Sequence, residues 1–183
     1  MLTLASASPQ RRAILAQLGI EFEVVVPGVE ELTGGDPRTT VVENARRKLA
    51  AVPGDPVVAA DTEVVLDGQV FGKAADAAQA QSFLEQLSGR THEVWGGLAL
   101  RQRGEKHTAH AVTRVRFRAL EPTEIAWYVG SGEWRDRAGA YAIQGMGAAL
   151  VDAVEGDFWN VVGLPLAALM RLAPDLVAGI SLD

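Results

Sequence analysis

The spacing of apolar residues along the chain switches repeatedly between a helical period and short strand-like runs. The run Pro56–Ala60 is continuously apolar and predicts a buried strand that ends in Asp61-Thr62. The other runs of strand type are Leu2–Leu4, Phe22–Val26 and Ala148–Val154. Apolar residues three or four apart predict helices over residues 9–18, Thr39–Val52, Ala77–Leu87, Pro122–Val129 and Leu164–Leu172.

Two turn signals add antiparallel hairpins to this pattern. Asp67-Gly68 separates strands expected at Glu63–Leu66 and Gln69–Phe71, and a longer pair is expected around Arg103-Gly104-Glu105. The strands of that second hairpin would be Thr91–Arg101 and Lys106–Arg118. Because strands and helices interleave, the pattern predicts an α/β fold with a mixed sheet. Residues 173–183 carry little signal.

Composition and charge narrow the class of protein. A chain of 183 residues predicts one domain over 1–183 with a real core. No run approaches the ~20 apolar residues of a membrane helix, and the N-terminus does not resemble a secretory signal. We therefore expect a cytoplasmic protein without a membrane partner. The net charge of −6 argues against nucleic-acid binding, and the absence of cysteine excludes disulfides and thiolate metal sites.

The segment LASASPQRRAIL near the N-terminus is the clearest candidate for ligand binding. Ser8 is expected to cap a helix whose first residue is Pro9, and Gly19 is expected to close it. Arg11 and Arg12 would then lie in the first turn, near free backbone N–H groups and the positive end of the helix dipole. This combination predicts an anion-binding site, and the ligand that it favours is a phosphate group.

Asp61 is the candidate for chemistry. An acid at the carboxyl end of a buried strand lies where open α/β sheets collect ligands, and it could hold a divalent cation or take a proton from water. A turn or helix-cap acid is an equal alternative. Glu31, Lys48 and Lys73 look like surface charges singly, but together with Asp61 they would suit a magnesium-bound polyphosphate.

Three other features have a functional and a structural interpretation. The glycine-dense stretch from Arg137 to Gly147 permits close backbone approach, and its Gln144 could pair with a base edge, although a tightly packed loop is also consistent. The alternating arginines Arg114, Arg116 and Arg118 could form a basic stripe for nucleic acid, but in an acidic chain they are interpreted as the solvent face of an edge hairpin. His107 and His110 are interpreted as surface histidines, because residues three apart on a strand face opposite sides.

Taken together, these blocks resemble the Maf family of nucleoside triphosphate pyrophosphatases. The resemblance spans about Leu2 to Leu172 and rests on motifs that follow one another in the same order. They are SASPQRRAILAQLG, Glu31 after an apolar strand, ENARRKLA, AADTEVVLDG, FGK, LSGRTHEVWGG, DRAGAYAIQGMGA and EGDFWNVVGLPL.

The resemblance implies an elongated, two-lobed α/β fold with a strongly twisted mixed sheet flanked by helices and a central cleft, similar to inosine triphosphate pyrophosphatases. It implies hydrolysis between the α- and β-phosphates with a divalent metal, Mg²⁺ or Mn²⁺, and a possible homodimer. The site residues that it implies fall into three groups. Asp61, Lys48 and Lys73 would be catalytic, Glu31 and Asp61 would bind the metal, and the substrate would be bound by Ser8, Gln10, Arg11, Thr62 and Gln144.

The subgroup follows from the two blocks that face the base. Asp61-Thr62 and Ile143-Gln144-Gly145 resemble members that act on dTTP and UTP, and an amide suits the N3–H and O4 edge of thymine or uracil. Gln10 matches neither that subgroup, which carries Arg there, nor the subgroup acting on 7-methyl-GTP. The alternatives are therefore an enzyme of the same type acting on 7-methyl-GTP, or a non-catalytic nucleotide-binding regulator of septum formation. Ala74 and Trp95-Gly96 also depart from the family pattern but do not affect the proposed acids.

Overall fold

The computed structural model describes residues 1–178 and contains one seven-stranded mixed sheet. The strand order is β2-β1-β3-β5-β6-β7, and β4 pairs with β3 outside this path. The strands are β1 (Leu2–Ala5), β2 (Phe22–Val25), β3 (Val57–Leu66), β4 (Gln69–Phe71), β5 (Thr91–Gln102), β6 (Glu105–Phe117) and β7 (Val151–Glu155). The helices are α1 (Pro9–Gln17), α2 (Pro37–Ala50), α3 (Ala77–Leu87), α4 (Pro122–Ser131), α5 (Phe158–Val162), α6 (Leu166–Leu172), α7 (Asp175–Ala178) and the 3₁₀ turn Met146–Leu150.

The middle strand β3 determines where the site forms. β1 pairs in parallel with β2 and with the beginning of β3, where Thr3 and Leu4 face Val57 and Val58. β3 then continues past the end of β1 and pairs in antiparallel fashion with β5 and β4. The prediction that this strand ends at Ala60 was therefore wrong. Asp61 lies inside a ten-residue strand, although it does lie beyond the end of the parallel part of the sheet.

Helices pack on both faces of the sheet, and two consecutive glycines of β5 allow them to approach closely. A Cβ at Gly97 would lie 2.1 Å from the carbonyl oxygen of Val41 in α2. A Cβ at Gly96, on the opposite face, would lie 1.8 Å from the Asn160 side-chain oxygen of α5. Asn160 uses this space to donate to the backbone oxygen of Val94. Gly96 and Gly97 therefore determine how closely α5 and α2 approach the strands of the sheet.

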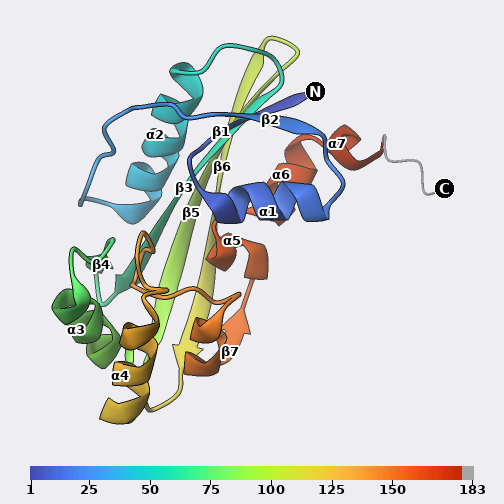
Figure 1. Cartoon of the computed structure of the whole chain (residues 1–183). Helices are drawn as coiled ribbons and strands as arrows, with labels where there is room; N and C mark the ends of the chain where they lie inside the picture. Colours follow the sequence, from blue (N-terminus) through green and yellow to red (C-terminus); the bar gives the residue numbers. More distant parts are fainter. Residues whose placement is uncertain (179–183) are drawn as a thin grey trace.

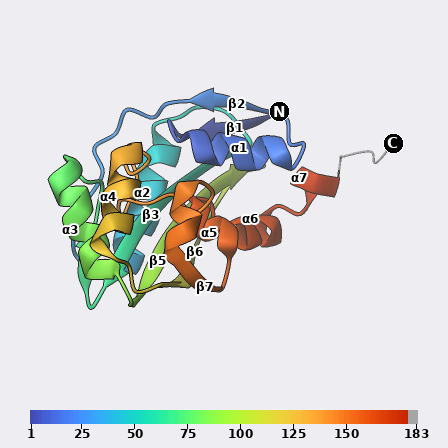
Figure 2. The same ribbon diagram turned by 60° about the horizontal axis from the view of Figure 1, so that its bottom comes forward.

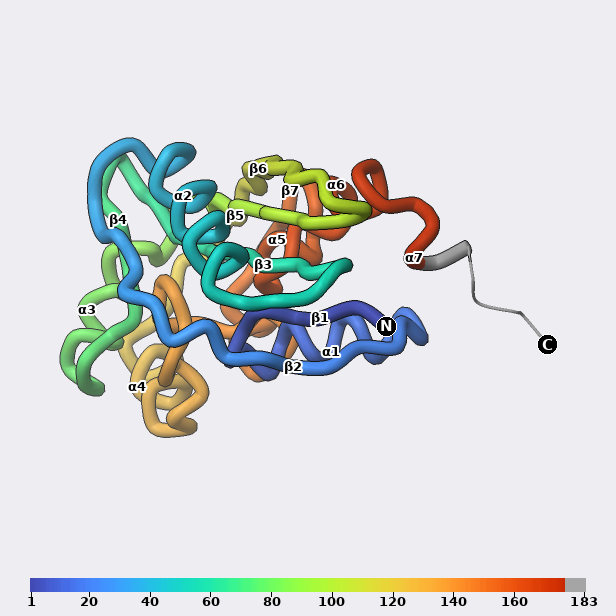
Figure 3. The backbone as a smooth tube through the Cα atoms, turned by 90° about the horizontal axis from the view of Figure 1, so that it is seen from above, coloured from blue at the N-terminus to red at the C-terminus, as the bar shows by residue number. Residues whose placement is uncertain are grey.

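The molecule is elongated along the strands β3, β5 and β6 (Figure 1), and its core consists of three clusters. One cluster includes Leu84 of α3 and Tyr128 of α4. These two helices lie next to each other at one end of the molecule (Figure 2). A second includes Leu4 of β1 and Leu15 of α1. A third, smaller cluster packs Leu49 of α2 on the other face of the sheet. Seen from above, α7 lies at the end far from α3 and α4 (Figure 3). The prediction of a mixed α/β fold with helices flanking the sheet is confirmed.

Local signals in the sequence located most elements correctly. Ser8 caps α1, Asp76 caps α3, and the Asp67-Gly68 turn joins β3 to β4. Helix α2 begins at Pro37 rather than at Thr39, because Asp36 is its cap and accepts a hydrogen bond from the Thr39 backbone.

The C-terminal third differs from the prediction. The 3₁₀ turn occupies the start of the strand expected at Ala148–Val154, so that β7 begins at Val151. The helix expected over Leu164–Leu172 begins at Leu166, after Pro165, and α5 precedes it without having been predicted. In the weak-signal region, α7 covers Asp175–Ala178, and residues 179–183 lie outside the described part.

The arginine stripe faces solvent as expected. Arg114 and Arg116 are exposed, and Arg116 pairs with Asp152 at 2.6 Å. Their strand is not an edge, however, because β7 pairs with it there. His107 and His110 both lie near the surface, and His110 stacks on Trp95. Within residues 1–178, no helix has the length and apolar character needed to cross a membrane.

Candidate active site

One large cavity, of about 1170 Å³, brings together every site residue that the family resemblance implies, whereas Arg12, the second arginine of the predicted anion site, is exposed and does not line it. It is lined by parts of the chain from Ser6 to Gly163. The proposed residues along its wall are Ser8, Gln10, Arg11, Glu31, Lys48, Asp61, Thr62, Lys73 and Gln144. A smaller cavity of about 310 Å³ between α2 and β6 contains none of them. Residues far apart in the sequence therefore share one cleft.

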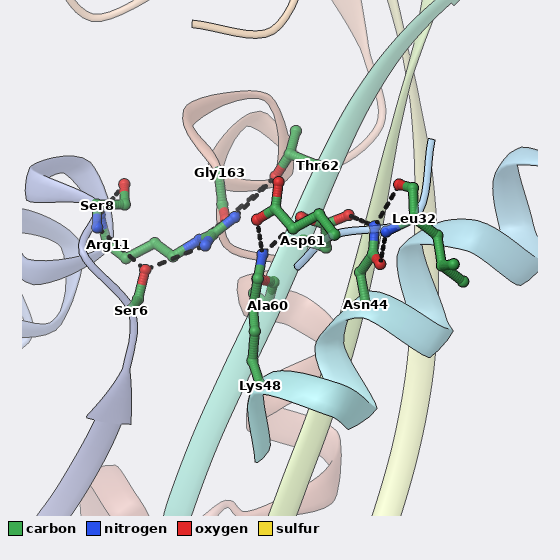
Figure 4. Close-up of polar contacts among 11 residues, drawn as sticks. Ser6, Ser8, Arg11, Leu32, Asn44, Lys48, Ala60, Asp61, Thr62 and Gly163 are labelled. Atoms are coloured by element: carbon green, nitrogen blue, oxygen red, sulfur yellow. Dashed lines mark hydrogen bonds and ion pairs between the residues drawn. The ribbon is translucent and has the colours of Figure 1, made fainter. Parts of the chain in front are cut away.

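Asp61 is held by two donors from α2. Lys48 Nζ lies 2.7 Å from one carboxylate oxygen, and Asn44 Nδ2 donates to the other at 2.8 Å (Figure 4). Asn44 and Lys48 are four residues apart, which puts them on the same face of the helix. The Asp61 side chain is only 8% exposed. Its orientation is thus fixed by two charge-assisted hydrogen bonds in a largely buried setting.

Glu31 faces the same ammonium group from the loop before α2. Lys48 Nζ lies 2.5 Å from Glu31 Oε1 and also donates to the Ala60 carbonyl at 3.3 Å. Burial raises the pKa of Glu31, but the hydrogen bond and charge of Lys48, together with Lys73 and Arg11, outweigh it and hold the pKa below its ordinary value. Glu31 and Asp61 are therefore two carboxylates that share one cation.

Arg11 reaches the site from the other face of β3. Its Nε donates to the Gly163 carbonyl at 2.7 Å, Nη1 to Ser6 Oγ at 3.1 Å, and Nη2 to Thr62 Oγ1 at 3.3 Å (Figure 4). Arg11 is 8% exposed, and burial lowers its pKa while the charges of Asp61 and Glu31 oppose that change. The anion-site prediction treated this guanidinium as open to a phosphate. In the structure three of its N–H groups already have protein acceptors.

Ser8 and Gln10 lie together at the start of α1. Ser8 Oγ accepts from the Arg11 backbone N–H at 3.5 Å and donates to Gln10 Oε1 at 3.0 Å. Lys73 and Gln144 are exposed where they line the cavity. Lys73 is placed by a backbone bridge to Ala138. The cavity wall therefore has a polar rim, with Asp61 and Arg11 buried behind it.

Two carboxylates in this arrangement could hold a divalent cation. Mg²⁺ is commonly bound by one or two carboxylates, with substrate phosphates and water completing its shell. Asp61 and Glu31 meet that requirement. Within residues 1–178, no group of three or more His, Cys, Asp or Glu side chains is arranged to hold a metal by itself. The donor set therefore fits a metal that arrives with a phosphate better than one held entirely by protein.

Two residues of the site were missed in the sequence. Asn44 bonds to Asp61 and also exchanges two hydrogen bonds with the Leu32 backbone, at 2.7 and 3.0 Å, which ties the Glu31 loop to α2. Its spacing of four from Lys48 was the available signal. Glu63 is 8% exposed, and its Oε2 has no partner among the described residues. Burial and the charges of Asp61 and Glu31 raise the pKa of Glu63 to about 7. Its spacing of two from Asp61 puts it on the same face of β3.

Comparison with known proteins shows that the chain is similar over most of its length to several named relatives. A protein from Symbiobacterium thermophilum named dTTP/UTP pyrophosphatase is 50% identical over 177 residues, covering 93% of this chain and 91% of the relative. Proteins of the same name from Thermus thermophilus and Pyrococcus furiosus are 49% and 40% identical, and each alignment covers 92% of the relative. Among solved structures, the Staphylococcus aureus Ham1 protein aligns with a TM-score of 0.46 at 16% identity, covering 63% of this chain and 71% of that one. That likeness is too distant to carry a functional argument. The family described as Maf-like protein matches residues 1–176, and the chain belongs to the Maf family.

Proposed function

We propose that this protein hydrolyses the bond between the α- and β-phosphates of dTTP, UTP or a modified pyrimidine nucleoside triphosphate, giving the monophosphate and pyrophosphate. The observation that carries the proposal is the buried Asp61 carboxylate, oriented by Lys48 and Asn44 inside a cavity large enough for a nucleotide. The relatives named dTTP/UTP pyrophosphatase support the same reaction.

Asp61 is the group suited to take a proton from the attacking water. Both of its oxygens accept one protein hydrogen bond, and each keeps lone-pair capacity for a further donor. A carboxylate whose direction is fixed loses little entropy when it meets the water, so its position contributes to the rate. Lys48, which bonds to Asp61, also lies on the cavity wall with Lys73. These two cations would stabilise negative charge that develops on the departing pyrophosphate.

Asp61 and Glu31 would hold the divalent metal, Mg²⁺ or Mn²⁺. When bound, the metal would offset the charge of the phosphates and polarise the bond that breaks. The fit rests on two partly or largely buried carboxylates that share the single ammonium group of Lys48. Their combined negative charge exceeds that of their one shared counterion, which favours an additional cation when the substrate binds.

The remaining cavity residues would recognise the substrate. Ser8 and Arg11 lie near the start of α1, where phosphate oxygens are favoured, and Gln10 lies beside Ser8. Thr62 and Gln144 would face the base. The Gln144 amide offers both a donor and an acceptor, which matches the N3–H and O4 edge of thymine or uracil.

A nucleotide panel tests the proposal. The purified protein with Mg²⁺ or Mn²⁺ is expected to release pyrophosphate, and not orthophosphate, from dTTP and UTP faster than from dCTP, GTP or 7-methyl-GTP. Asp61→Asn should lower kcat by about 100-fold or more, since a positioned general base contributes that much. Asp152→Asn, an exposed acid of β7 outside the cavity, is the matched control.

The outcomes separate the alternatives. Full activity of Asp61→Asn would remove Asp61 as the base, and preferred turnover of 7-methyl-GTP would move the protein to the other subgroup. Nucleotide binding without any turnover would favour the regulatory function. Repeating the panel with Gln10→Arg tests whether Gln10 takes part in selectivity. The proposal further includes a cytoplasmic location. It also includes a homodimer, and sedimentation of the intact protein would test this oligomeric state.

A further inference from the structure

Arg137 is a half-buried cation on the cavity wall for which the described residues offer no acceptor. Its Nε is buried without a hydrogen-bond partner, and none of its guanidinium N–H groups makes a protein hydrogen bond or ion pair within residues 1–178. A buried donor left unpaired costs about 1–3 kcal/mol, so such a group in a folded protein calls for an explanation.

The segment that carries Arg137 is held firmly. Gly139 N–H is shared between the carbonyls of Phe71 and Gly72, at 2.8 and 3.1 Å. Ala138 forms a backbone bridge with Lys73. A Cβ at Gly139 would lie 2.9 Å from a methyl group of Val64, so the backbone packs directly on β3. Arg137 is therefore presented next to Lys73 by a fixed backbone rather than by a loose loop.

The other cations of the cavity are already engaged. Lys48 lies between Glu31 and Asp61, and three N–H groups of Arg11 bond to protein. Arg135 lies over the Trp134 ring, 4.7 Å from its centroid. Arg137 and Lys73 are thus the cavity cations with no protein acceptor in the described structure.

Neighbouring acids do not supply the missing acceptor. Both Glu133 oxygens accept backbone N–H groups, from Met146 at 3.0 Å and from Gly147 at 2.9 Å. Asp136, the residue before Arg137, is exposed and forms no ion pair among the described residues. Since no neighbouring acid among the described residues bonds to Arg137 and its guanidinium lies on the cavity wall, a ligand in the cavity can supply the acceptor, and phosphate oxygens match a planar guanidinium well.

We propose that Arg137 binds a phosphate group of the nucleotide, so that the triphosphate lies between the α1 side of the cavity and the Lys73–Arg137 side. This inference rests on the proposed function for the identity of the ligand. It adds to the phosphate-binding set a residue from the glycine-dense segment, whose Gln144 is expected to serve the base. One segment would then contact both parts of the substrate.

Binding measurements test the role of Arg137 without relying on turnover. The probes are pyrophosphate and the non-hydrolysable α,β-imido analogues of dTTP and GTP, titrated by calorimetry in the presence of Mg²⁺. Arg137→Gln should weaken pyrophosphate and both analogues by about 10- to 100-fold, the range for charge-assisted hydrogen bonds. Arg137→Lys should recover part of the loss. Arg114→Gln, an exposed arginine outside the cavity, should bind like the wild type.

Two results would overturn the proposal. One is unchanged affinity of Arg137→Gln for pyrophosphate and for both analogues. The other is a loss confined to one base with pyrophosphate unaffected, which would make Arg137 a base contact. If Arg137→Gln fails to fold, the wild type decides: pyrophosphate should protect Arg137 from modification by phenylglyoxal, and lack of protection refutes the idea. Wild-type protein that binds pyrophosphate through Arg137 but releases none from any nucleotide would instead refute the proposed function.

Discussion

The burial of one histidine leads us to expect that the free energy of unfolding depends on pH in acid. His92 of β5 is 1% exposed and packs edge-on against Phe117 and Tyr141, at ring-centroid distances of 5.0 and 5.5 Å. Its Nε2 lies 2.9 Å from the Tyr141 hydroxyl, while Nδ1 has no partner among the described residues. Burial therefore lowers the pKa of His92 from 6.5 to about 4. The perturbation we consider is acidification from pH 7.

The sign and size of the effect follow from this pKa. Since the folded value lies below that of the unfolded chain, the unfolded state takes up the proton first as the pH falls. The stabilising contribution is complete above about pH 6.5 and is lost as the pH falls toward 4. A shift of this size corresponds to about 3 kcal/mol of the free energy of unfolding, most of which is lost by pH 4.5.

The assay compares wild type with His92→Phe, whose ring fills the same aromatic cluster but does not titrate. Urea unfolding followed by fluorescence of the tryptophans, four in the chain, gives the free energy of unfolding at several pH values between 7 and 4.5. Carboxylates such as Glu31 titrate in both proteins, so the difference between them isolates His92. That difference should move by about 2–3 kcal/mol in favour of the variant on acidification. A difference that stays constant over this range would refute the reasoning.

Three further substitutions test positions described above. Asn44→Ala removes a donor from Asp61 and both bonds to Leu32, so kcat for pyrophosphate release should fall about 10- to 100-fold, whereas the exposed Arg46→Ala should not change it. Equal kcat values would show that Asn44 does not position Asp61. Gly97→Ala would place a Cβ 2.1 Å from Val41 O and should lower the free energy of unfolding by about 1–3 kcal/mol. Its control, Gly130→Ala, adds a methyl group in open space on α4 and should raise that free energy by about 0.5–1 kcal/mol. Urea unfolding at pH 7 measures both variants, and an unchanged free energy of unfolding for Gly97→Ala would contradict the close approach of α2. Glu133→Gln replaces one of the two oxygens that accept the Met146 and Gly147 backbone N–H groups with an NH2 group, which cannot accept. Because these N–H groups follow Gln144, we expect the kcat/KM preference for dTTP over GTP to fall about tenfold, mainly through KM. Glu155→Gln, on exposed β7, is its control, and a preserved preference would separate Glu133 from base selection.

Features decided within a few residues were predictable from the sequence. The Ser8-Pro9 helix start, the Asp76 cap and the Asp67-Gly68 turn each depend on contacts spanning three or four positions. The site residues were also located together, because the family resemblance supplied their association. Their common cavity is now observed, while their individual roles stay predictions.

Features decided by distant contacts were not predictable. The strand expected to end at Ala60 continues because Asp61 and Glu63 face a cavity whose opposite wall comes from other segments, so polar residues there do not end the sheet. Helix α5 has only five residues, and its position depends on Asn160 filling the space above Gly96. Neither contact leaves a periodic pattern in the sequence.

The bond between Arg11 Nε and the Gly163 carbonyl joins residues 152 positions apart. During synthesis, the N-terminal strand and helix exist long before their acceptor does. Arg11 therefore obtains this acceptor only after α5 and the turn that follows it have been synthesised. A chain shortened before that turn would retain Asp61 and Lys48, but the guanidinium of Arg11 would lack this hydrogen bond. The cleft is therefore complete only after the segment around Gly163 has been synthesised and packed, which makes its assembly a late folding event relative to Asp61 and Lys48.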